Sequence, residues 1–141
     1  MPQRPDLLLV DSITEAIGRG AGWIVVSGSH GGASAGRFAI EARLRIAVFN
    51  DAGVGKDGAG VKALDALQRN AIAACTVGHD SARIGDAAST LHDGVISHAN
   101  PLAAALGAQP GQRLREWIAT LPHSTRPARN AAAGQPLGAG P

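Results

Sequence analysis

The sequence predicts a single α/β domain built on a doubly wound, mostly parallel five-stranded sheet with helices on both faces, in a Rossmann-like or flavodoxin-like arrangement. Two observations predict this fold. Short apolar runs alternate with segments of helical composition, and each run ends in a cluster of Gly, Asp, Asn, Ser or His residues. Strand–helix alternation with short connections favours a parallel sheet covered by helices.

Five apolar runs are the expected strands, at residues 7–10, 23–27, 45–49, 72–77 and 95–97. The second run is apolar without alternation, which is typical of a strand covered on both faces. We expect it to stop after Ser27 in a glycine-rich turn and to lead into a helix.

Helices are expected at residues 12–19, 34–43, 58–69 and 101–121, with a break near Pro110 in the last one and at most one short helix in 78–94. Ser12 followed by Glu15 has the spacing of a capping box. Asn100 and Pro101 have the residue types of an N-cap and a first helical position. An apolar face is predicted for the last helix, formed by Leu114, Trp117, Ile118 and Leu121.

The chain of 141 residues has a length suited to one domain. We expect a loose N-terminus at 1–5, the α/β domain at 6–121, and a disordered tail at 122–141, where Ala, Gly, Pro and Arg dominate. The net charge of +2 and the aromatic content of 3% do not predict a nucleic-acid-binding surface.

No apolar run approaches the roughly 18–20 residues that cross a bilayer, so the sequence predicts no membrane partner. No secretory signal is visible at the N-terminus, and the cytoplasm is therefore the expected location. Cys75 is the single cysteine, which excludes an internal disulfide, and its apolar neighbours predict a small buried side chain.

Polar clusters follow the expected strands, and they define the candidate site. They are Asp11-Ser12, Ser29-His30, Asn50-Asp51, His79-Asp80 and His98-Ala99-Asn100. Parallel sheets bind ligands outside the carboxyl ends of their strands. Ordinary turn chemistry explains Gly, Asp and Ser at these places, but it explains three histidines less well. We therefore expect a small-molecule site at this edge.

His30 and His79 are the expected proton-transfer groups of that site. Asp51 would orient a histidine or act as a base. Asn50 and the backbone amides of 29–32, including those of Gly31 and Gly32, would polarise a carbonyl group. His98 and Asn100 are expected to contact the substrate.

Ser29 is a candidate nucleophile, although the sequence departs from the Gly-x-Ser-x-Gly elbow because Ser27 replaces the first glycine. Adjacent Ser and His side chains do not normally face each other, so another histidine such as His79 would have to activate Ser29.

The segment Gly53-Val54-Gly55-Lys56 follows a strand, as a phosphate-binding loop does. It lacks the first glycine of that pattern and the hydroxyl residue after the lysine. A looser anion site with Lys56 remains an alternative to an ordinary glycine-rich turn. Arg83 is the second candidate anion ligand, or it belongs to an ion-pair cluster with Asp80 and Asp86 on one helix face.

His30, His79 and His98 are candidate metal ligands, because imidazole is a common zinc ligand. With the common strand order 2-1-3-4-5, His30 and His98 start about 19 Å apart. A site shared by His79 and His98 stays open as an alternative, but neither a metal nor an organic cofactor is predicted.

These patterns favour a small cytoplasmic enzyme that uses acid/base chemistry on a small polar or anionic metabolite, most consistent with a hydrolase or a lyase. The alternative is a non-catalytic ligand-binding or regulatory subunit of a larger assembly. A domain of this size has little depth to exclude water, so a homo-oligomer that completes the pocket is expected.

Overall fold

The computed structural model describes residues 4–123 and contains one sheet of five strands in the order β1-β2-β3-β4-β5. The strands are β1 (Leu7–Val10), β2 (Ile24–His30), β3 (Ile46–Asn50), β4 (Ala73–Val77) and β5 (Ile96–Ala99). Strands β1 to β4 are parallel, and β5 is antiparallel to β4. The predicted mostly parallel α/β sheet is therefore confirmed. Residues 1–3 of the expected loose N-terminus and 124–141 of the expected tail lie outside the described residues.

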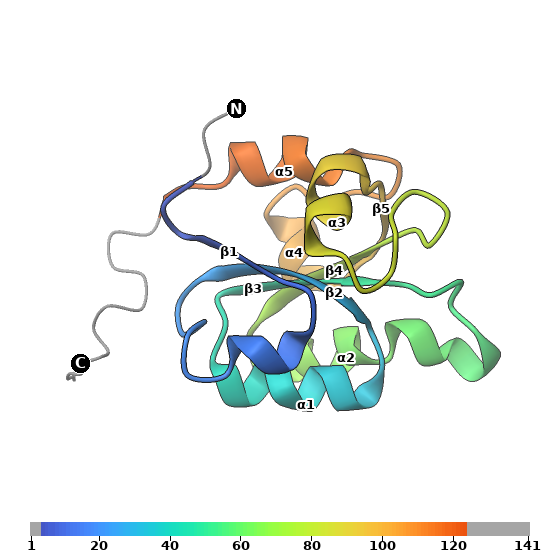
Figure 1. Ribbon diagram of the computed structural model, residues 1–141, viewed down its shortest axis with the longest axis horizontal. Helices are drawn as coiled ribbons and strands as arrows, with labels where there is room; N and C mark the ends of the chain where they lie inside the picture. The colour runs from blue at the N-terminus through green and yellow to red at the C-terminus, as the bar shows by residue number, and fades with distance from the viewer. Residues whose placement is uncertain (1–3, 124–141) are drawn as a thin grey trace.

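The strand order 2-1-3-4-5 that we assumed is wrong, because the strands follow one another sequentially. The direction of β5 also corrects the expectation that His98 and Asn100 lie at the carboxyl edge. After β4 the chain does not cross back to the amino edge before the next strand, and the N–H of Gly78 donates to the carbonyl of Val95 at 2.9 Å. Strand β5 therefore begins at the carboxyl edge of β4 and runs away from it (Figure 1).

Helical segments connect the strands. They are η1 (Ile13–Ala16), α1 (Ala33–Ala42), η2 (Lys56–Val61), α2 (Ala63–Arg69), α3 (Ala87–Asp93), α4 (Pro101–Ala105) and α5 (Leu114–Thr120). As predicted, Ser12 caps η1, and Asn100 with Pro101 begins α4. Strand β2 does not end at Ser27: it continues to His30 through an irregularity in its pairing with β3.

Successive side chains along the strands point to opposite faces of the sheet and pack into two apolar clusters, one on each face. Val25, Ala47 and Ala74 belong to the cluster that also holds buried residues of η1, α1 and α2. Val26, Val48 and Cys75 belong to the other cluster, together with buried residues of α4 and α5. Figure 1 shows η1, α1 and α2 below the sheet and α3, α4 and α5 above it.

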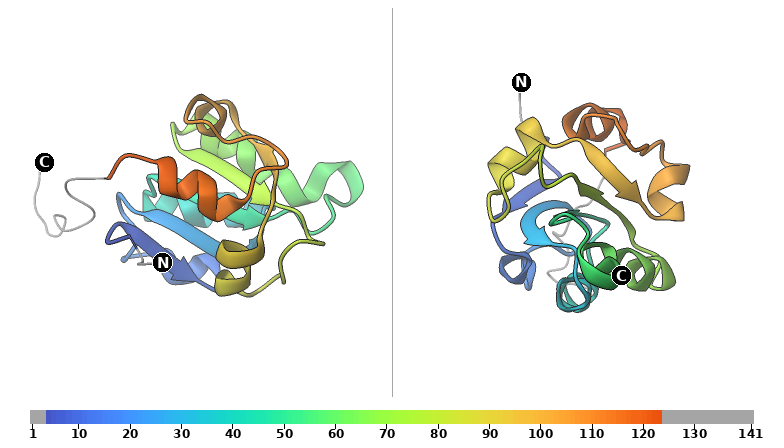
Figure 2. Two further views of the ribbon diagram at one scale, coloured as in Figure 1. Left: turned by 90° about the horizontal axis from the view of Figure 1, so that it is seen from above. Right: turned by 90° about the vertical axis from the view of Figure 1, so that its right-hand side faces the viewer.

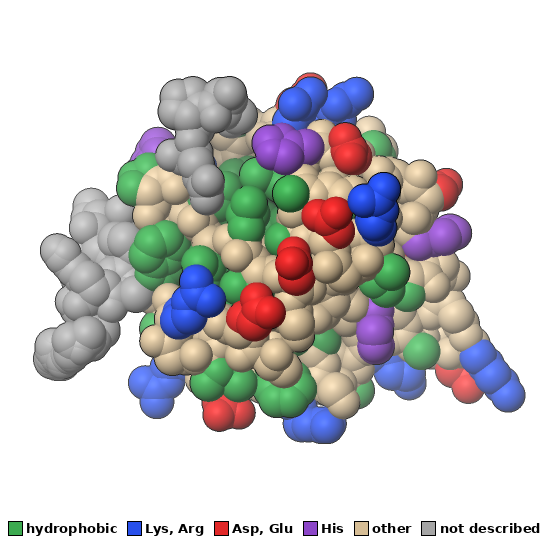
Figure 3. All heavy atoms as spheres, viewed as in Figure 1, with side chains coloured by type: hydrophobic (Ala, Val, Ile, Leu, Met, Phe, Trp, Pro, Cys, Tyr) green, Lys and Arg blue, Asp and Glu red, His purple; other side chains and the backbone are tan. Residues whose placement is uncertain are grey.

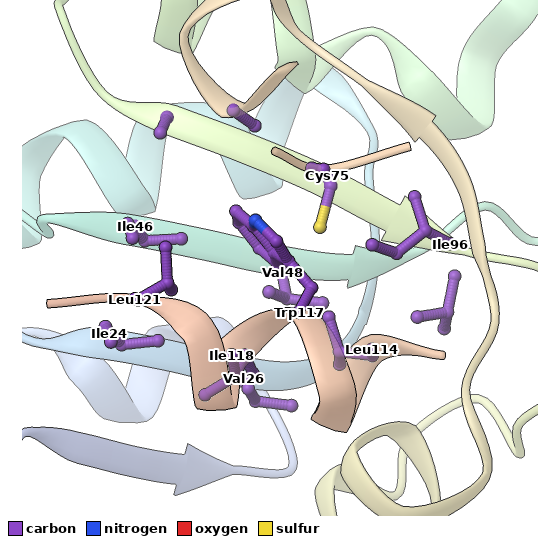
Figure 4. Close-up of a cluster of buried hydrophobic side chains, with 14 of the residues drawn as sticks. Ile24, Val26, Ile46, Val48, Cys75, Ile96, Leu114, Trp117, Ile118 and Leu121 are labelled. Carbon is purple, nitrogen blue, oxygen red and sulfur yellow. The ribbon is translucent and has the colours of Figure 1, made fainter. Parts of the chain in front are cut away.

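Helix α5 carries the predicted apolar face into the core. Leu114 and Trp117 are fully buried, and Ile118 and Leu121 are almost so. In Figure 4 the Trp117 indole lies over the sheet near Val48 and Cys75. Its Nε1–H donates to the carbonyl of Leu106 at 3.0 Å, which satisfies the polar atom of this large side chain.

The carboxyl ends of β2, β3 and β4 point toward the loops that hold most of the polar clusters, and the right panel of Figure 2 looks onto this edge. Figure 3 shows acidic and basic side chains interspersed on the face that it displays. Among residues 4–123, no helix is long and apolar enough to cross a membrane.

Candidate functional site: an aspartate–histidine pair at the carboxyl edge of the sheet

Asn50, the last residue of β3, is fully buried and its amide is used by the fold. Its Nδ2 donates to the carbonyl of Ala82 at 3.1 Å, and its Oδ1 accepts from the N–H of Ala52 at 2.7 Å. Both ends of the amide therefore hold loops in place. The structure does not leave Asn50 exposed for the predicted role of polarising a substrate carbonyl.

Asp51 follows directly and is 5% exposed. Its Oδ1 accepts from the N–H of Gly53 at 2.8 Å and from the N–H of His79 at 3.0 Å. Burial alone raises the pKa of Asp51, but hydrogen bonds from Gly53, from the Ser97 side chain and from the His79 backbone, with the charge of His79, outweigh burial and lower it. Asp51 is therefore held as a carboxylate.

His79 lies beyond the end of β4, and its Nδ1 is 3.6 Å from Oδ1 of Asp51. The His79 side chain is 61% exposed and that of Asp51 is 7% exposed. Gly53 flanks the imidazole: a Cβ on Gly53 would lie 3.6 Å from both Cε1 and Nδ1 of His79. Because Nδ1 faces the buried carboxylate, Nε2 on the far side of the ring is presented to solvent. The structure thus brings two predicted site residues, Asp51 and His79, together.

The loop after Asp51 has an unusual backbone. Positive φ angles occur at Ala52, Gly53, Val54, Gly55, Asp57 and Gly58. Val54, with φ of 69°, is a β-branched residue in a conformation that such residues rarely adopt. Its N–H donates to the carbonyl of Asp51 at 2.7 Å, and its own carbonyl accepts from Gly60 at 2.6 Å. The loop is therefore closed on itself around Asp51.

This closure uses the amides that a phosphate cradle would need. The N–H groups of Ala52 and Gly53 bond the side chains of Asn50 and Asp51. The N–H groups of Val54 and Gly55 bond backbone carbonyls within the loop. Lys56 is exposed at the start of η2. The structure thus gives the predicted anion site the lysine but not the ring of free amides at 52–55.

In the Ser29–Gly32 segment, some residues make hydrogen bonds that hold the fold together, and another is exposed. The hydroxyl of Ser29 accepts from the N–H of Ile13 at 2.9 Å, which holds η1 rather than facing His79. The N–H of Gly31 donates to the carbonyl of Asn50 at 2.9 Å. His30 is exposed, and its ring lies against Gly32, where an added Cβ would come within 2.5 Å of His30 Cε1.

Arg83 does not share a helix face with Asp80 and Asp86, because α3 begins only at Ala87. Its guanidinium is 3.5 Å from the carboxylate of Asp86, and its side chain is 80% exposed. An exposed pair of this kind contributes little to stability. Arg83 is therefore exposed and is the partner of an acidic neighbour, and its role as an anion ligand stays a prediction.

Asn100 lies at the amino end of β4, away from the other candidates. Its Oδ1 accepts from the N–H groups of Ala74 and Ala103, both at 3.0 Å. Its Nδ2 donates to the carbonyls of Leu64 at 3.2 Å and Ile72 at 3.0 Å. Four hydrogen bonds use the whole amide, so the geometry gives Asn100 a structural role.

His98 is exposed on β5 opposite Thr76 of β4. Its Nδ1 is 3.2 Å from Oγ of Ser97 and 3.5 Å from Oγ1 of Thr76. Neither Ser97 nor Thr76 was predicted as a site residue. No residue pattern in the chain signals them, because their proximity depends on the pairing of β5 with β4. Within residues 4–123, no group of three or more His, Cys, Asp or Glu side chains is placed to hold a metal.

Two hollows lie at the opposite, amino edge of the sheet. One has a volume of about 310 Å³ and is lined by Ile40, Arg43, Leu44, Asn70, Ala71 and Ile72. The other, of about 280 Å³, is lined by Arg45, Ile46, Ala71, Ala73, Leu102, Ala105 and Leu106. Neither contains a predicted site residue, so the polar site is an open edge and not the floor of either hollow.

Comparisons of the chain with protein-family models, with curated proteins and with solved structures find no match.

Proposed function

We propose that this protein is a small enzyme that performs acid/base chemistry on a small polar metabolite, with His79 as the proton-transfer group and Asp51 as its orienting carboxylate. The single observation that carries the proposal is the pairing of a buried carboxylate with Nδ1 of an exposed histidine. A carboxylate in this position fixes the tautomer and orientation of the imidazole and stabilises its charged form.

The separation of 3.6 Å is longer than a hydrogen bond. Catalytic hydrogen bonds in ligand-free sites are often long and tighten when substrate binds. The pair is well prepared for such closure, because the Oδ1 that faces Nδ1 already accepts the backbone N–H of His79. A small rotation of the imidazole would complete the bond.

His30 offers a second proton-transfer group at a distance suited to a small substrate. It pairs with Asn50 across β2 and β3, and Asn50 pairs with Val77 across β3 and β4. Two strand spacings amount to about 10 Å. These are backbone positions, and His79 follows Val77 by two residues, so an extended metabolite lying across the end of β3 would be needed to reach both His30 and His79.

Hydrolysis and elimination are the reaction classes that such a pair of histidines supports, because both need one proton removed and one delivered. An anionic substrate is proposed because Lys56 and Arg83 are exposed at the same edge. A cytoplasmic location and a homo-oligomeric state belong to the same proposal. The exposure of His79 supports the homo-oligomeric state, because a neighbouring copy of the protein would shield the site from water.

A non-catalytic ligand-binding or regulatory subunit is the second candidate function. The same exposure of His79 favours it, since efficient acid/base sites exclude water. The two candidates differ in what they require of His79: a binding protein needs the contact, whereas an enzyme needs the proton transfer.

A ligand screen followed by turnover assays tests the proposal. Thermal unfolding would be followed with small carboxylates, amides, phosphates and nucleotides, since a ligand of the native state raises stability by RT ln(1 + [L]/Kd). Compounds that stabilise the protein would then be assayed for conversion with the wild type, His79→Gln and Asp51→Asn. His92→Gln is the matched control, because His92 is an exposed histidine on α3.

We expect conversion to fall by roughly 100-fold or more in His79→Gln, the usual contribution of a positioned acid or base, and to be unchanged in His92→Gln. Binding without conversion in the wild type would favour the regulatory subunit. Equal turnover of His79→Gln and the wild type would refute the role of His79.

A further inference from the structure

A cluster of charged side chains lies at the amino edge of the sheet, where β1 begins and α5 ends, at the left of Figure 1. Asp6 is 1% exposed there and faces two arginines. Arg4 donates to both carboxylate oxygens of Asp6, each at 2.9 Å, whereas Arg45 reaches only Oδ2, at 3.2 Å. One carboxylate carries one negative charge, and Arg4 already holds it in bidentate geometry. The charge of Arg45 is therefore left without a carboxylate of its own among residues 4–123.

The two arginines also differ in how many of their five side-chain N–H groups are used. Arg4 uses all five: two bond Asp6, and three donate to carbonyls at and just after the end of α5, at 2.6–3.0 Å. The Arg45 side chain donates to Asp6 and, at 2.7 Å, to the carbonyl of Pro122, and these are the hydrogen bonds found for it within residues 4–123. Since the Arg45 side chain is 26% exposed, its three remaining N–H groups can donate to a further acceptor.

Arg45 also borders one of the two hollows at this edge. This hollow, the α4 hollow, has a volume of about 280 Å³. Its lining also includes Ile46, Ala71, Ala73, Leu102, Ala105 and Leu106, all of which have apolar side chains. Leu106 is 43% exposed and is one of three large hydrophobic side chains that are exposed in the described part of the chain. An open apolar surface beside an incompletely bonded cation suits a ligand with an apolar body and an anionic end.

We propose that the α4 hollow binds a free alkyl monocarboxylate of about six to ten carbons, with its carboxylate on Arg45 and its chain against Leu102 and Leu106. A carboxylate can accept two parallel N–H bonds from one guanidinium, and it supplies the negative charge that Arg45 lacks. The chain length follows from the volume, because a cavity of roughly 150 Å³ holds the six carbons of benzene. The hollow lies at the opposite edge of the sheet from the aspartate–histidine pair. The inference therefore goes beyond the proposed acid/base function and does not depend on it.

Isothermal titration calorimetry of the full chain tests the proposal. The ligands are butyrate, hexanoate and octanoate, below the concentration at which they form micelles, and octan-1-ol, which has the chain of octanoate without its charge. The variants are Arg45→Gln and Leu106→Ser. Arg37→Gln and Ile84→Ser are the matched controls, because Arg37 is an exposed arginine on α1 and Ile84 is 51% exposed in the segment before α3. Amide shifts in ¹H–¹⁵N correlation spectra show where each ligand binds.

We expect the affinity of the wild type to rise by roughly two- to fourfold for each added methylene, as each one leaves water. Octanoate should bind at least about tenfold more tightly than octan-1-ol, because a charged hydrogen-bonding partner is present only in the acid. Arg45→Gln should lower the affinity for octanoate to that of the alcohol and leave the alcohol unaffected. Leu106→Ser should weaken both ligands by roughly threefold or more. Neither control should change the affinities, and the amide signals of Ala73 and Ala105 should shift on binding.

Equal affinities for octanoate and octan-1-ol, no gain in affinity with chain length, or no binding of octanoate at millimolar concentration would overturn the inference. Amide shifts confined to Gly53 and His79 would also overturn it, because the ligand would then lie at the carboxyl edge. If Arg45→Gln does not fold, as judged by circular dichroism, the acid and the alcohol compared in the wild type and in Leu106→Ser still decide the outcome. Octanoate binding that His79→Gln leaves unchanged belongs to the α4 hollow, so this inference and the proposed function can fail separately.

Discussion

Oδ1 of Asp51 accepts the backbone N–H of His79 at 3.0 Å and lies 3.6 Å from Nδ1 of the same residue. One carboxylate oxygen therefore faces both the backbone and the ring of this histidine. The N–H of Gly53 donates to the same oxygen at 2.8 Å. The carboxylate thus fixes where β3 turns, where β4 ends and which nitrogen of His79 faces inward.

Asp51 should make the stability of the protein depend on pH in the acid range. Its pKa in the folded protein is lowered from the ordinary value of 3.8. The stability that it contributes is therefore fully present above about pH 4 and is lost as the pH falls through the folded-state pKa. Urea unfolding at pH 7, 5, 4 and 3 should show the wild type losing stability relative to Asp51→Asn only at the acid end.

Asp86→Asn is the control for that titration, since Asp86 also accepts a backbone hydrogen bond, at the N-cap of α3, and no pKa shift of Asp51 depends on it. When Asp51→Asn is compared with its parent in an Asp86→Asn background, the same pH-dependent difference in stability should appear. A difference that is constant from pH 7 to pH 3 would contradict the lowered pKa of Asp51.

Gly60→Ala should destabilise the protein more than Gly58→Ala, although Gly58 has the positive φ. A Cβ on Gly60 would clash with the carbonyl oxygen of Asp51, so the loop around Asp51 would have to move. A Cβ on Gly58 would meet only a side-chain methyl of Val61 at 3.9 Å, and the cost there is the left-handed backbone. We expect roughly 2–4 kcal/mol for the first and about 1 kcal/mol for the second.

Chemical denaturation at neutral pH measures both losses. The His79 ring signals should also shift in Gly60→Ala and remain in place in Gly58→Ala, because only the first displaces Asp51. Equal losses of stability would show that the loop accommodates a side chain at residue 60 without moving.

The sequence was sufficient to predict the class of fold, because the spacing of apolar residues that indicates a strand or a helix lies within each element. Apolar runs such as 23–27 and the amphipathic spacing of Leu114, Trp117 and Ile118 follow from which faces are buried. The caps at Ser12 and Asn100 depend on one side chain and the next few amides, and both are present.

Strand order and the direction of β5 could not be predicted from the sequence. The direction of β5 depends on whether the irregular segment after β4 leads the chain back to the amino edge of the sheet or leaves it at the carboxyl edge. The same limit applies to the site. Asp51 and His79 could be named because each follows a predicted strand. Ser97 could not, because a one-residue bulge decides where its hydroxyl points. The prediction that Asn100 lies at the carboxyl edge was wrong, because the sequence pattern of a polar residue after a strand is the same at either edge of a sheet.

Asn100→Ala should lower the stability of the fold without altering any ligand site. Its amide makes four hydrogen bonds in a position that is 3% exposed, and the substitution leaves the N–H groups of Ala74 and Ala103 without this acceptor. Unsatisfied buried groups cost roughly 1–3 kcal/mol each, so a loss of about 2–5 kcal/mol is expected. Thermal and urea unfolding measure it.

Asn70→Ala is the matched control, since Asn70 makes an exposed side-chain bond to the carbonyl of Ala66. It should cost well under 1 kcal/mol. Any compound found to bind the wild type should keep its affinity in Asn100→Ala at a temperature where the variant is folded. A loss of affinity with unchanged stability would place Asn100 in the site after all.

Cys75 reports on the same region because it lies opposite Ala99, next to Asn100. Its side chain is fully buried, and burial raises the pKa of its thiol to about 12. The thiolate is the nucleophile that attacks iodoacetamide and displaces iodide, so the folded protein should resist labelling at about pH 8 and react only when β4 and β5 separate. Mass spectrometry of iodoacetamide-treated protein should show slow labelling of the wild type and Asn70→Ala, and labelling accelerated by at least tenfold in Asn100→Ala. Rapid labelling of the native wild type would show instead that the β4–β5 pairing opens independently of global unfolding.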